Sequence, residues 1–368
     1  MQNVRSKLLF SCFLVVKLFY IFNLSCMEQQ NLEFKIENVN FESMKLIGVG
    51  GSKKVYRVNL LSDPNKYAAL AIFDKDKKNE QQIALELNRE LYFFDTYKHE
   101  NIITLYDFSV KDKMLLFEYG FDNLYRFISN LRKKRKCEKC TSEHHVLLLC
   151  KLQILIDLLS AVVFLHKKNI IYRDLKPENI VFVGTNDKFK TMLIDPGSFV
   201  EIPEGKNFIT DSKFAISIGY VDPNIYKNMN KNEDRKHDID CYLENDIYSI
   251  AMIIFFVIYE HDFFKFFLYT KKSQTENYIE IFLNNSKTWL DVTTEFLLNK
   301  KERLDLKTIR FLYKKVDTEI RNKIDDLICK CWDTEFENRP TAQNILDELI
   351  KIKKMVDEQN ETLKEVND

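Results

Sequence analysis

The chain has 368 residues, 45% of them hydrophobic and 30% charged, and its 55 basic side chains balance its 55 acidic ones. The length is natural for two lobes or two domains, and the many Phe and Tyr beside few Gly and Pro argue against a disordered chain. The zero net charge gives no basis for nucleic-acid binding.

The N-terminal segment, residues 1–26, has the pattern of a signal peptide or a short membrane anchor. Two basic residues precede an apolar run over 8–24, which Lys17 interrupts and which is slightly short for a bilayer-spanning helix. We expect this leader to direct the protein to the secretory pathway, secreted or anchored only through that run. The alternative is that Met27 is the true start and the protein is cytoplasmic.

A polar spacer over 27–40 leads into a globular body at 41–354, and a charged tail follows at 355–368. The first part of the body has β-branched and aromatic runs between turn signals, which predict strands, and one stretch with helical spacing of apolar residues. We expect strands at 45–47, 55–60, 67–73, 103–108 and 114–119, and a helix at 81–96 with Ile83, Leu87, Leu91 and Phe94 on one face.

The second part of the body is mostly helical. Apolar residues recur at helical spacing in three stretches, 146–165, 246–259 and 320–332. The sequence therefore predicts an α+β fold, with a small β-rich lobe at about 41–120 and a larger α-rich lobe at about 121–354.

A basic run at 132–136 is followed by Cys137, Cys140, His144 and His145. One C-x-x-C pair with two histidines is compatible with zinc, but the spacing fits no common zinc finger. We interpret the segment as a solvated loop between two helices, with a docking surface for acidic partners as the alternative.

Four polar residues carry the strongest chemical signal: Asp174, Lys176, Asn179 and, further on, Asp195. Phosphoryl transfer needs phosphates held, charge neutralised and the acceptor hydroxyl placed in line. A carboxylate such as that of Asp174 accepts the hydroxyl proton, and the amine of Lys176 neutralises the migrating phosphoryl group. The side-chain oxygens of Asn179 and Asp195 are the ligands that Mg²⁺ prefers.

The loop Tyr172–Asn179 resembles the H-R-D-L-K-P-E-N catalytic loop of eukaryotic protein kinases, with Tyr in place of His. The resemblance extends over about 41–354, and Lys176 is typical of the serine/threonine branch. Four further segments carry the resemblance. His99–Ile102 is similar to the turn after the regulatory helix, and Phe117–Gly120 is similar to the hinge. Asp246–Ser249 is similar to the start of the buried helix below the catalytic loop, and Glu337–Thr341 is similar to the late N-R-P-T.

This resemblance implies a bilobal fold that binds ATP and Mg²⁺. The residues it assigns to the nucleotide are Gly48, Gly50, Gly51, Lys53, Val55, Ala71, Glu90, Glu118, Tyr119 and Asp122. The first of these form a G-x-G-x-x-G-x-V loop, whose glycines let the backbone approach phosphates. Glu90 matches the ion-pairing glutamate of the regulatory helix, and Asp122 matches a ribose contact. Phe117 stands at the gatekeeper position before the hinge.

The lysine of the family's V-A-I-K strand is missing. Phe73 stands in its place, and Lys53 stands at the third glycine of the glycine loop, a pattern similar to that of the with-no-lysine kinases. One hypothesis is that the amine of Lys53 replaces the missing one and pairs with Glu90, while Lys54 faces the opposite side of the strand. The alternative is a pseudokinase that keeps the fold for binding or scaffolding.

Two further motifs depart from the family. Asp195-Pro196-Gly197 replaces D-F-G, and because proline has no aromatic ring we expect the packing behind the active–inactive switch to be altered. Asn224 stands at the glutamate of A-P-E, whose family partner is an arginine that Arg339 matches. This predicts an uncharged and weaker tie to Arg339.

The activation segment implied by the resemblance is 198–219. It contains Thr210 and Ser212, and Arg173 is the type of residue that pairs with a phosphate there, although ordinary loop polarity explains both hydroxyls equally well. Ser217 is expected to touch the base and the lysine of the catalytic loop and to help set hydroxyl specificity.

The sequence thus predicts a serine/threonine protein kinase that transfers the γ-phosphoryl group of MgATP to hydroxyls of a protein substrate, without a nucleic-acid partner. A silent pseudokinase is the alternative. A small-molecule kinase is third, because such enzymes lack the protein-substrate platform that the activation segment and Arg339 indicate.

Overall fold

The computed structural model describes residues 33–137, 144–185, 188–211, 217, 219–222, 225, 239–261 and 317–365. The leader, residues 27–32 of the spacer, Cys140, Ser212 and Asn224 lie outside the described residues, as do the side chains of Cys137, His144 and His145. Within the described part, sheets and helices combine in the α+β class that the sequence predicts.

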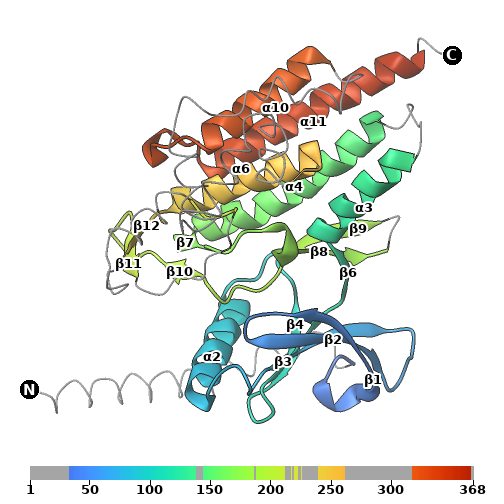
Figure 1. The fold of residues 1–368 in the computed structure, drawn as a ribbon, viewed down its shortest axis with the longest axis vertical. Coiled ribbons are helices and arrows are strands. Elements are labelled where there is room, and N and C mark those ends of the chain that lie inside the picture. Colours follow the sequence, from blue (N-terminus) through green and yellow to red (C-terminus); the bar gives the residue numbers. More distant parts are fainter. Residues whose placement is uncertain are drawn as a thin grey trace, which may run out of the picture. The chain divides into compact units, whose positions relative to one another are not determined.

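Two compact units make up the described chain, and its elements are shown in Figure 1. Unit one contains the described residues up to Asn88 together with Thr104–Tyr119. Unit two contains Arg89–Ile103 and the described residues from Gly120 onward. The two units are therefore interleaved along the chain.

Unit one is built on a five-stranded antiparallel sheet in the order β1-β2-β3-β5-β4, preceded by the short 3₁₀ helix η2 (Ile36–Asn38). Its strands are β1 (Val39–Val49), β2 (Lys53–Leu60), β3 (Tyr67–Phe73), β4 (Leu105–Ser109) and β5 (Met114–Glu118). All five predicted strands are present, and the first is longer than predicted, since the polar stretch before it also pairs with β2.

The central strand β3 is apolar almost throughout because it is covered on both faces. On one face, Ala68 and Leu70 pack with Val39, Val58 and Leu116 in a buried cluster. Side chains alternate along a strand, so residues 69, 71 and 73 share the opposite face.

Helix α2 (Glu80–Thr96) follows β3 and confirms the helix predicted at 81–96. The four side chains expected on one face are all buried, with exposed fractions of 0% for Ile83, 0% for Leu87, 3% for Leu91 and 5% for Phe94. The helix contributes to both units, since unit one ends at Asn88.

Unit two contains three small antiparallel sheets and five described helices. The strands are β6 (Gly120–Asn123), β8 (Ile180–Gly184) and β9 (Phe189–Leu193) in one sheet, β7 (Ile170–Ile171) with β10 (Val200–Glu201), and β11 (Ile209–Asp211) with β12 (Ile239–Cys241). The helices are α3 (Leu124–Cys137), α4 (His144–His166), α6 (Leu243–Tyr259), α10 (Thr318–Cys331) and α11 (Ala342–Glu365), with the 3₁₀ turns η3 (Pro177–Asn179) and η6 (Phe336–Asn338).

Helices α4 and α6 form the core of unit two. Every residue of α6 from Asp246 to Tyr259 is buried, and α4 packs against both α6 and α11. The stretch Leu147–His166 is long and apolar enough to cross a membrane by length and composition alone, but 56% of its apolar window is buried inside the protein, as in a core helix of a soluble protein.

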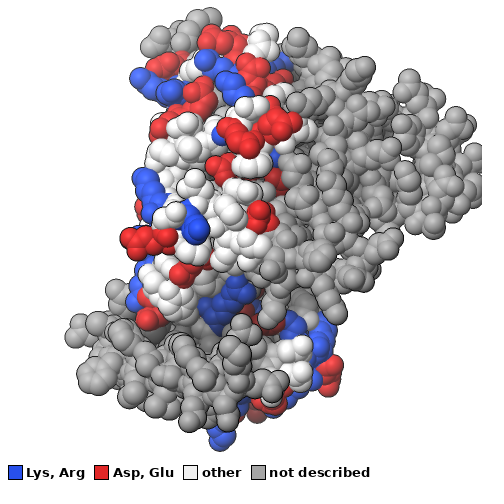
Figure 2. Space-filling view, turned by 90° about the vertical axis from the view of Figure 1, so that its left-hand side faces the viewer, with Lys and Arg blue, Asp and Glu red and all other residues white. Residues whose placement is uncertain are grey.

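A buried ion pair joins these two helices. The amine of Lys151 on α4 lies 2.7 Å from Oε1 of Glu260, with both side chains at most 1% exposed. Glu260 ends α6 in the left-handed conformation, with φ of 58°. On the face shown in Figure 2, acidic and basic side chains are interspersed over the described surface, as the zero net charge suggests.

Candidate active site

The loop Tyr172–Asn179 lies between β7 and β8 and is held by the first turns of α6. Asp246, fully buried, accepts backbone N–H bonds from Tyr172 at 2.7 Å and from Arg173 at 2.9 Å. Nε2 of His166, at the end of α4, lies 3.1 Å from the same carboxylate. Arg173 has a left-handed φ of 69°, which is uncommon for a residue with a side chain, so these contacts hold a strained backbone in place.

Three of the five predicted catalytic residues, all except Asp195 and Lys53, form one hydrogen-bonded group in this loop. Oδ2 of Asp174 accepts bonds from Nζ of Lys176 at 2.7 Å and from Nδ2 of Asn179 at 2.9 Å. The hydroxyl of Ser217 donates to Oδ1 of Asp174 at 2.5 Å, and Lys176 donates to that hydroxyl at 3.0 Å. The contact predicted for Ser217 with the base and the lysine is thereby confirmed.

Asp195, the fourth residue, follows β9 and is tied to the loop through its neighbour in the chain. The N–H of Ile194 donates to the carbonyl of Asn179 at 2.9 Å, and the hydroxyl of Tyr172 donates to the carbonyl of Ile194. Asp195 is exposed and has a left-handed φ of 62°. Both bonds are made by Ile194, so Asp195 directly follows a residue that is fixed to the catalytic loop.

The donor set of Asn179 and Asp195 fits a magnesium ion. Nδ2 of Asn179 gives both its bonds to Asp174, one to Oδ2 and one to the backbone carbonyl, so the amide oxygen faces away from that residue. A carboxamide oxygen and an exposed carboxylate are hard oxygen ligands, which Mg²⁺ accepts while it keeps water and phosphate oxygens. Among the described residues no cluster of three or more His, Cys, Asp or Glu suits another metal.

The tyrosine that replaces the loop histidine stays protonated. Burial raises the pKa of Tyr172 well above its ordinary value, and the nearby carboxylates of Asp195, Asp174 and Glu90 raise it further because they disfavour a phenolate. The phenol is therefore a permanent donor to the carbonyl of Ile194.

In unit one, Lys53 and Phe73 are directly opposite each other in the register of β2 and β3. Cross-strand partners project from the same face, and Nζ of Lys53 lies 5.5 Å from the centroid of the Phe73 ring. The pair Val55 and Ala71 is next along this face.

The neighbouring lysine projects from the other face of β2. Nζ of Lys54 lies 3.1 Å from Oδ2 of Asp74. The hydrogen bond to Asp74 raises the pKa of Lys54 and lowers that of Asp74. The prediction that Lys53 and Lys54 project from opposite faces of the strand is confirmed. Lys54 pairs with Asp74, whereas Lys53 lies over the ring of Phe73.

The glycine loop joins β1 to β2. Gly48 pairs with Val55, and the N–H of Gly50 donates to the carbonyl of Lys53 at 2.8 Å, while a methyl group at Gly51 would meet no heavy atom within 4 Å. The amine of Lys77 donates to the carbonyl of Gly50 at 2.9 Å. Lys77 was not among the predicted residues, because a loop lysine far along the chain gives no local signal.

The remaining residues assigned by resemblance have these positions. Glu90 is 2% exposed on α2, and its Oε1 lies 3.8 Å from the place of a Cβ on Gly197.

The N–H of Glu118 donates to the carbonyl of Thr104 at 3.0 Å. The ring of Tyr119 lies 5.8 Å from that of Tyr67. Oδ1 of Asp122 accepts a bond from Nε of Arg126 at 2.8 Å.

The tie to Arg339 differs from the prediction. Nη1 of Arg339 donates to Oδ2 of Asp222 at 2.5 Å, with side-chain exposures of 1% and 0%. Asn224 lies outside the described residues, but Asp222, two positions earlier, supplies the carboxylate. The prediction of an uncharged tie is therefore wrong: the negative charge is present at a different position in the chain.

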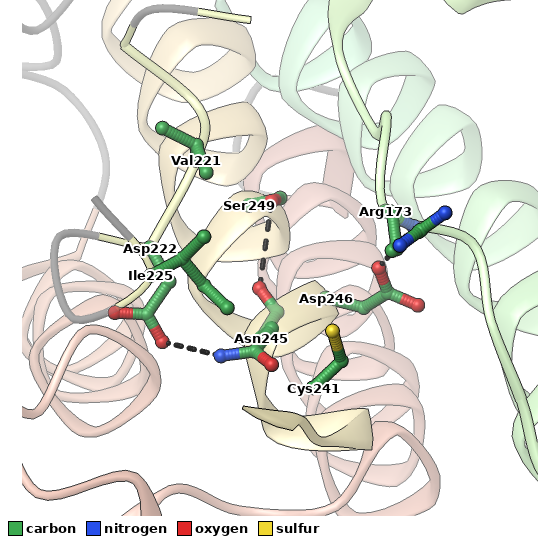
Figure 3. A pocket seen from close by; sticks show the side chains of 8 residues that line it. All are labelled: Arg173, Val221, Asp222, Ile225, Cys241, Asn245, Asp246 and Ser249. Carbon is green, nitrogen blue, oxygen red and sulfur yellow. Dashed lines mark hydrogen bonds between the residues drawn. The ribbon is translucent and has the colours of Figure 1, made fainter. Parts of the chain in front are cut away.

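Asp222 also borders a small cavity of about 10 Å³ between the end of the activation segment and α6 (Figure 3). Its carboxylate accepts a bond from Nδ2 of Asn245 at 2.9 Å, while Asp246 on the opposite wall holds Arg173. The thiol of Cys241 belongs to the same lining. A cavity of this size is at the lower limit for a single water molecule.

Thr210 in the activation segment and Arg173 in the catalytic loop have acidic or backbone partners. Oγ1 of Thr210 on β11 donates to Asp240 on β12 at 2.7 Å. Nε of Arg173, the expected phosphate partner, donates to the carbonyl of Ser198 at 2.5 Å. Thr210 is thus bound to a carboxylate, and the backbone of Ser198 is bound to the side chain of Arg173.

A family model described as "Protein kinase domain" matches residues 41–349. The chain is similar to the "Aurora kinase" of Yarrowia lipolytica, 30% identical over 59% of this chain and 51% of the relative, and to the "Serine/threonine-protein kinase sgk-1" of Caenorhabditis elegans, 29% identical over 55% and 40%. The "Probable serine/threonine-protein kinase fhkB" of Dictyostelium discoideum is 33% identical over 45% of this chain and 14% of its own length. The matched regions span about half or less of these relatives.

Proposed function

The chain belongs to the protein kinase family, and from this premise we propose that it transfers the γ-phosphoryl group of MgATP to serine or threonine hydroxyls of a protein substrate. The observation that carries the proposal is the position of the Ser217 hydroxyl, which lies 2.5 Å from Oδ1 of Asp174 and 3.0 Å from Nζ of Lys176. A hydroxyl held by a carboxylate and an amine has the arrangement that in-line transfer requires of its acceptor.

In this mechanism the loop residues have distinct roles. Asp174 orients the acceptor hydroxyl and takes its proton as the hydroxyl oxygen bonds to the γ-phosphorus of ATP and the bond from that phosphorus to the bridging oxygen of ADP breaks. The amine of Lys176 stabilises negative charge on the group in transit. Asn179 and Asp195 are the residues that would hold Mg²⁺, which when bound neutralises the charge of the nucleotide phosphates.

On the phosphate-binding side we propose that Lys53 supplies the amine that the β3 strand lacks. Its support is the register of β2 and β3, in which Lys53 is the direct partner of Phe73, the residue at the family's lysine position. The amine of Lys53 therefore comes from β2, the strand next to β3. It projects from the face of the sheet that also carries Val55 and Ala71.

The second candidate function is a pseudokinase that binds partners without catalysis. It is favoured by Phe73, which is 2% exposed and fills the lysine position with a ring that cannot bind phosphate. The two candidates make different predictions for the same pair of lysine variants.

Lys53→Ala is expected to lower kcat/KM for phosphotransfer about 10²–10³-fold, the usual effect of removing one charged group that stabilises the transition state. Lys54→Ala is the matched control, because it removes an identical side chain from the next position while its partner Asp74 lies on the other face. Lys54 is 40% exposed and projects from the face opposite Lys53, so its loss removes no amine from the phosphate-binding side, and activity should stay close to that of the unaltered chain. The measurement is ³²P transfer from MgATP to a serine/threonine peptide library.

Each result of this assay selects one reading. Activity that survives Lys53→Ala would disprove the relocated amine while keeping the enzyme. An unaltered chain that incorporates no more phosphate than Asp174→Ala, although MgATP still raises its Tm, would be a pseudokinase.

A further inference from the structure

A cluster around Phe199 fastens the stretch after Asp195 to the second half of α2. Phe199 is 4% exposed, and its ring meets aromatic and cationic partners from that helix and the residue just past it. The partners are Arg89, Tyr92, Phe93 and Tyr97. The ring of Phe93 is nearest, with 5.0 Å between centroids, and that of Tyr92 is stacked at 6.5 Å with 18° between planes. All of these residues belong to unit two.

Arg89 binds Phe199 in two ways. Its guanidinium carbon lies 5.1 Å from the ring centroid, a cation–π contact, and Nη2 donates to the carbonyl oxygen of the same residue. The side chain and the backbone of Phe199 are thus fixed together by one residue, which is the neighbour of Glu90 in the chain.

The residues that flank Phe199 are also anchored. Nε of Arg173 donates to the carbonyl of Ser198, and Glu201 accepts a bond from the hydroxyl of Tyr97 at 2.7 Å. Burial, and then the bond to Glu201, raises the pKa of Tyr97, so this phenol remains a donor. Strand pairing of Val200 with Ile171 completes the attachment, directly before the catalytic loop.

A turn connects this anchored stretch to Asp195. The N–H of Phe199 donates to the carbonyl of Pro196 at 3.0 Å, which closes the turn immediately after Asp195. On the other side, Oε1 of Glu90 approaches Gly197 within this turn. The position of Phe199 therefore determines where the turn lies, and with it where Asp195 points.

We propose that Phe199 is a positioning residue, which ties α2 to the turn after Asp195 and so sets the places of Asp195 and Glu90. It acts where residue 196, a proline, has no aromatic ring to pack. The proposal deepens and rests on the proposed function, in which Asp195 holds magnesium for phosphotransfer.

The test compares Phe199→Ala and Phe199→Tyr with Tyr125→Ala in the full chain. Tyr125 is a matched control, because it stacks on Phe256 at 5.7 Å in unit two and is not part of the Phe199 cluster. Hydrogen–deuterium exchange is followed in peptides covering 89–97 and 195–201, with a peptide from α11 as the internal reference. Phosphotransfer is measured as kcat, KM for the peptide and half-saturating Mg²⁺.

Phe199→Ala is expected to raise hydrogen–deuterium exchange at least ~10-fold in both peptides, because the segments 89–97 and 195–201 lose the contact that holds them together. It should lower kcat roughly 10–100-fold and raise the Mg²⁺ requirement with little change in KM for the peptide, since Asp195 rather than the substrate platform is displaced. Phe199→Tyr keeps the ring and should retain most activity. Tyr125→Ala should leave both peptides unchanged.

Faster exchange in 195–201 alone, without any change in 89–97, would overturn the proposal. The same holds if Tyr125→Ala reproduces the exchange and Mg²⁺ effects of Phe199→Ala. Because exchange needs no turnover, an unaltered chain without kinase activity would defeat the proposed function while the coupling of α2 to the turn is still measured.

A double-mutant cycle keeps the proposal testable if Phe199→Ala does not fold. Arg89→Met and Phe199→Leu, alone and together, are compared by exchange in the 89–97 peptide. Contacting residues are expected to be non-additive, with the second change adding little to the first. Strictly additive effects would show that Arg89 and Phe199 do not act together and would overturn the proposal.

Discussion

Asp174→Asn is expected to lower kcat for phosphotransfer about 10²–10⁴-fold, the range for loss of a positioned general base. The carboxylate accepts bonds from three donors, Lys176, Asn179 and Ser217, and takes the acceptor proton in the proposed mechanism. An amide has nearly the same shape, but it cannot take the proton, and its NH₂ group faces one of these donors. Binding of MgATP, read as a thermal shift, should persist because Asn179 and Asp195 are unchanged.

Ser217→Ala is the matched control for Asp174→Asn. It removes one hydrogen bond from the same carboxylate but leaves its charge, so kcat should fall by less than ~10-fold. The decisive comparison is the ratio of the two kcat values under saturating MgATP. If Asp174→Asn keeps as much activity as Ser217→Ala, Asp174 is not the base.

The second large effect is expected on stability. Asp222→Ala and Arg339→Ala should each lower the free energy of unfolding by about 3–5 kcal/mol, because either change leaves a buried charge without its partner. Arg339 also donates to the carbonyls of Glu244 and Asp333, so its loss releases three attachments at once. Urea unfolding monitored by circular dichroism gives the measurement.

An exposed ion pair provides the control. Lys190 and Glu100 lie 3.2 Å apart with side-chain exposures of 62% and 68%, and Lys190→Ala should change the unfolding free energy by no more than about 1 kcal/mol. Replacing both members of the buried pair, Asp222→Leu with Arg339→Met, should be less damaging than either single change to alanine. Equal losses for Lys190→Ala and Asp222→Ala would rule out the assigned role of the buried pair.

The sequence predicted features that depend on local spacing. Alternation along β2 placed Lys53 and Lys54 on opposite faces, and the structure has them opposite Phe73 and beside Asp74. Helical spacing identified the buried face of α2, and the offset of Ser217 within its motif located its contact with the base. In the first two cases strand or helix periodicity decides the outcome, and neighbouring residues are enough to show it; Ser217 was located by its position relative to the family motif.

Features that depend on pairs far apart in the chain were missed. Asp222 was passed over because matching by position assigned the partner of Arg339 to residue 224, and one sequence does not reveal a shift of two positions. Phe199 was missed for a related reason, since its importance lies in partners on α2 more than a hundred residues earlier. Nothing in the residues around either position signals these long-range contacts.

The interleaving of the two units has a consequence for how the protein is made. Residues 89–103 leave the ribosome long before their partner strand β9: Ile102 pairs with Leu193, and the N–H of Ile103 donates to the carbonyl of Leu193 at 3.0 Å. A nascent chain that has only reached Tyr119 can complete the sheet of unit one, but it carries these two isoleucines, each 5% exposed in the folded protein, without their cover. Such intermediates attract chaperones and aggregate. A fragment cut at residue 119 is therefore expected to leave Ile102 and Ile103 uncovered and is a poor choice for producing unit one alone.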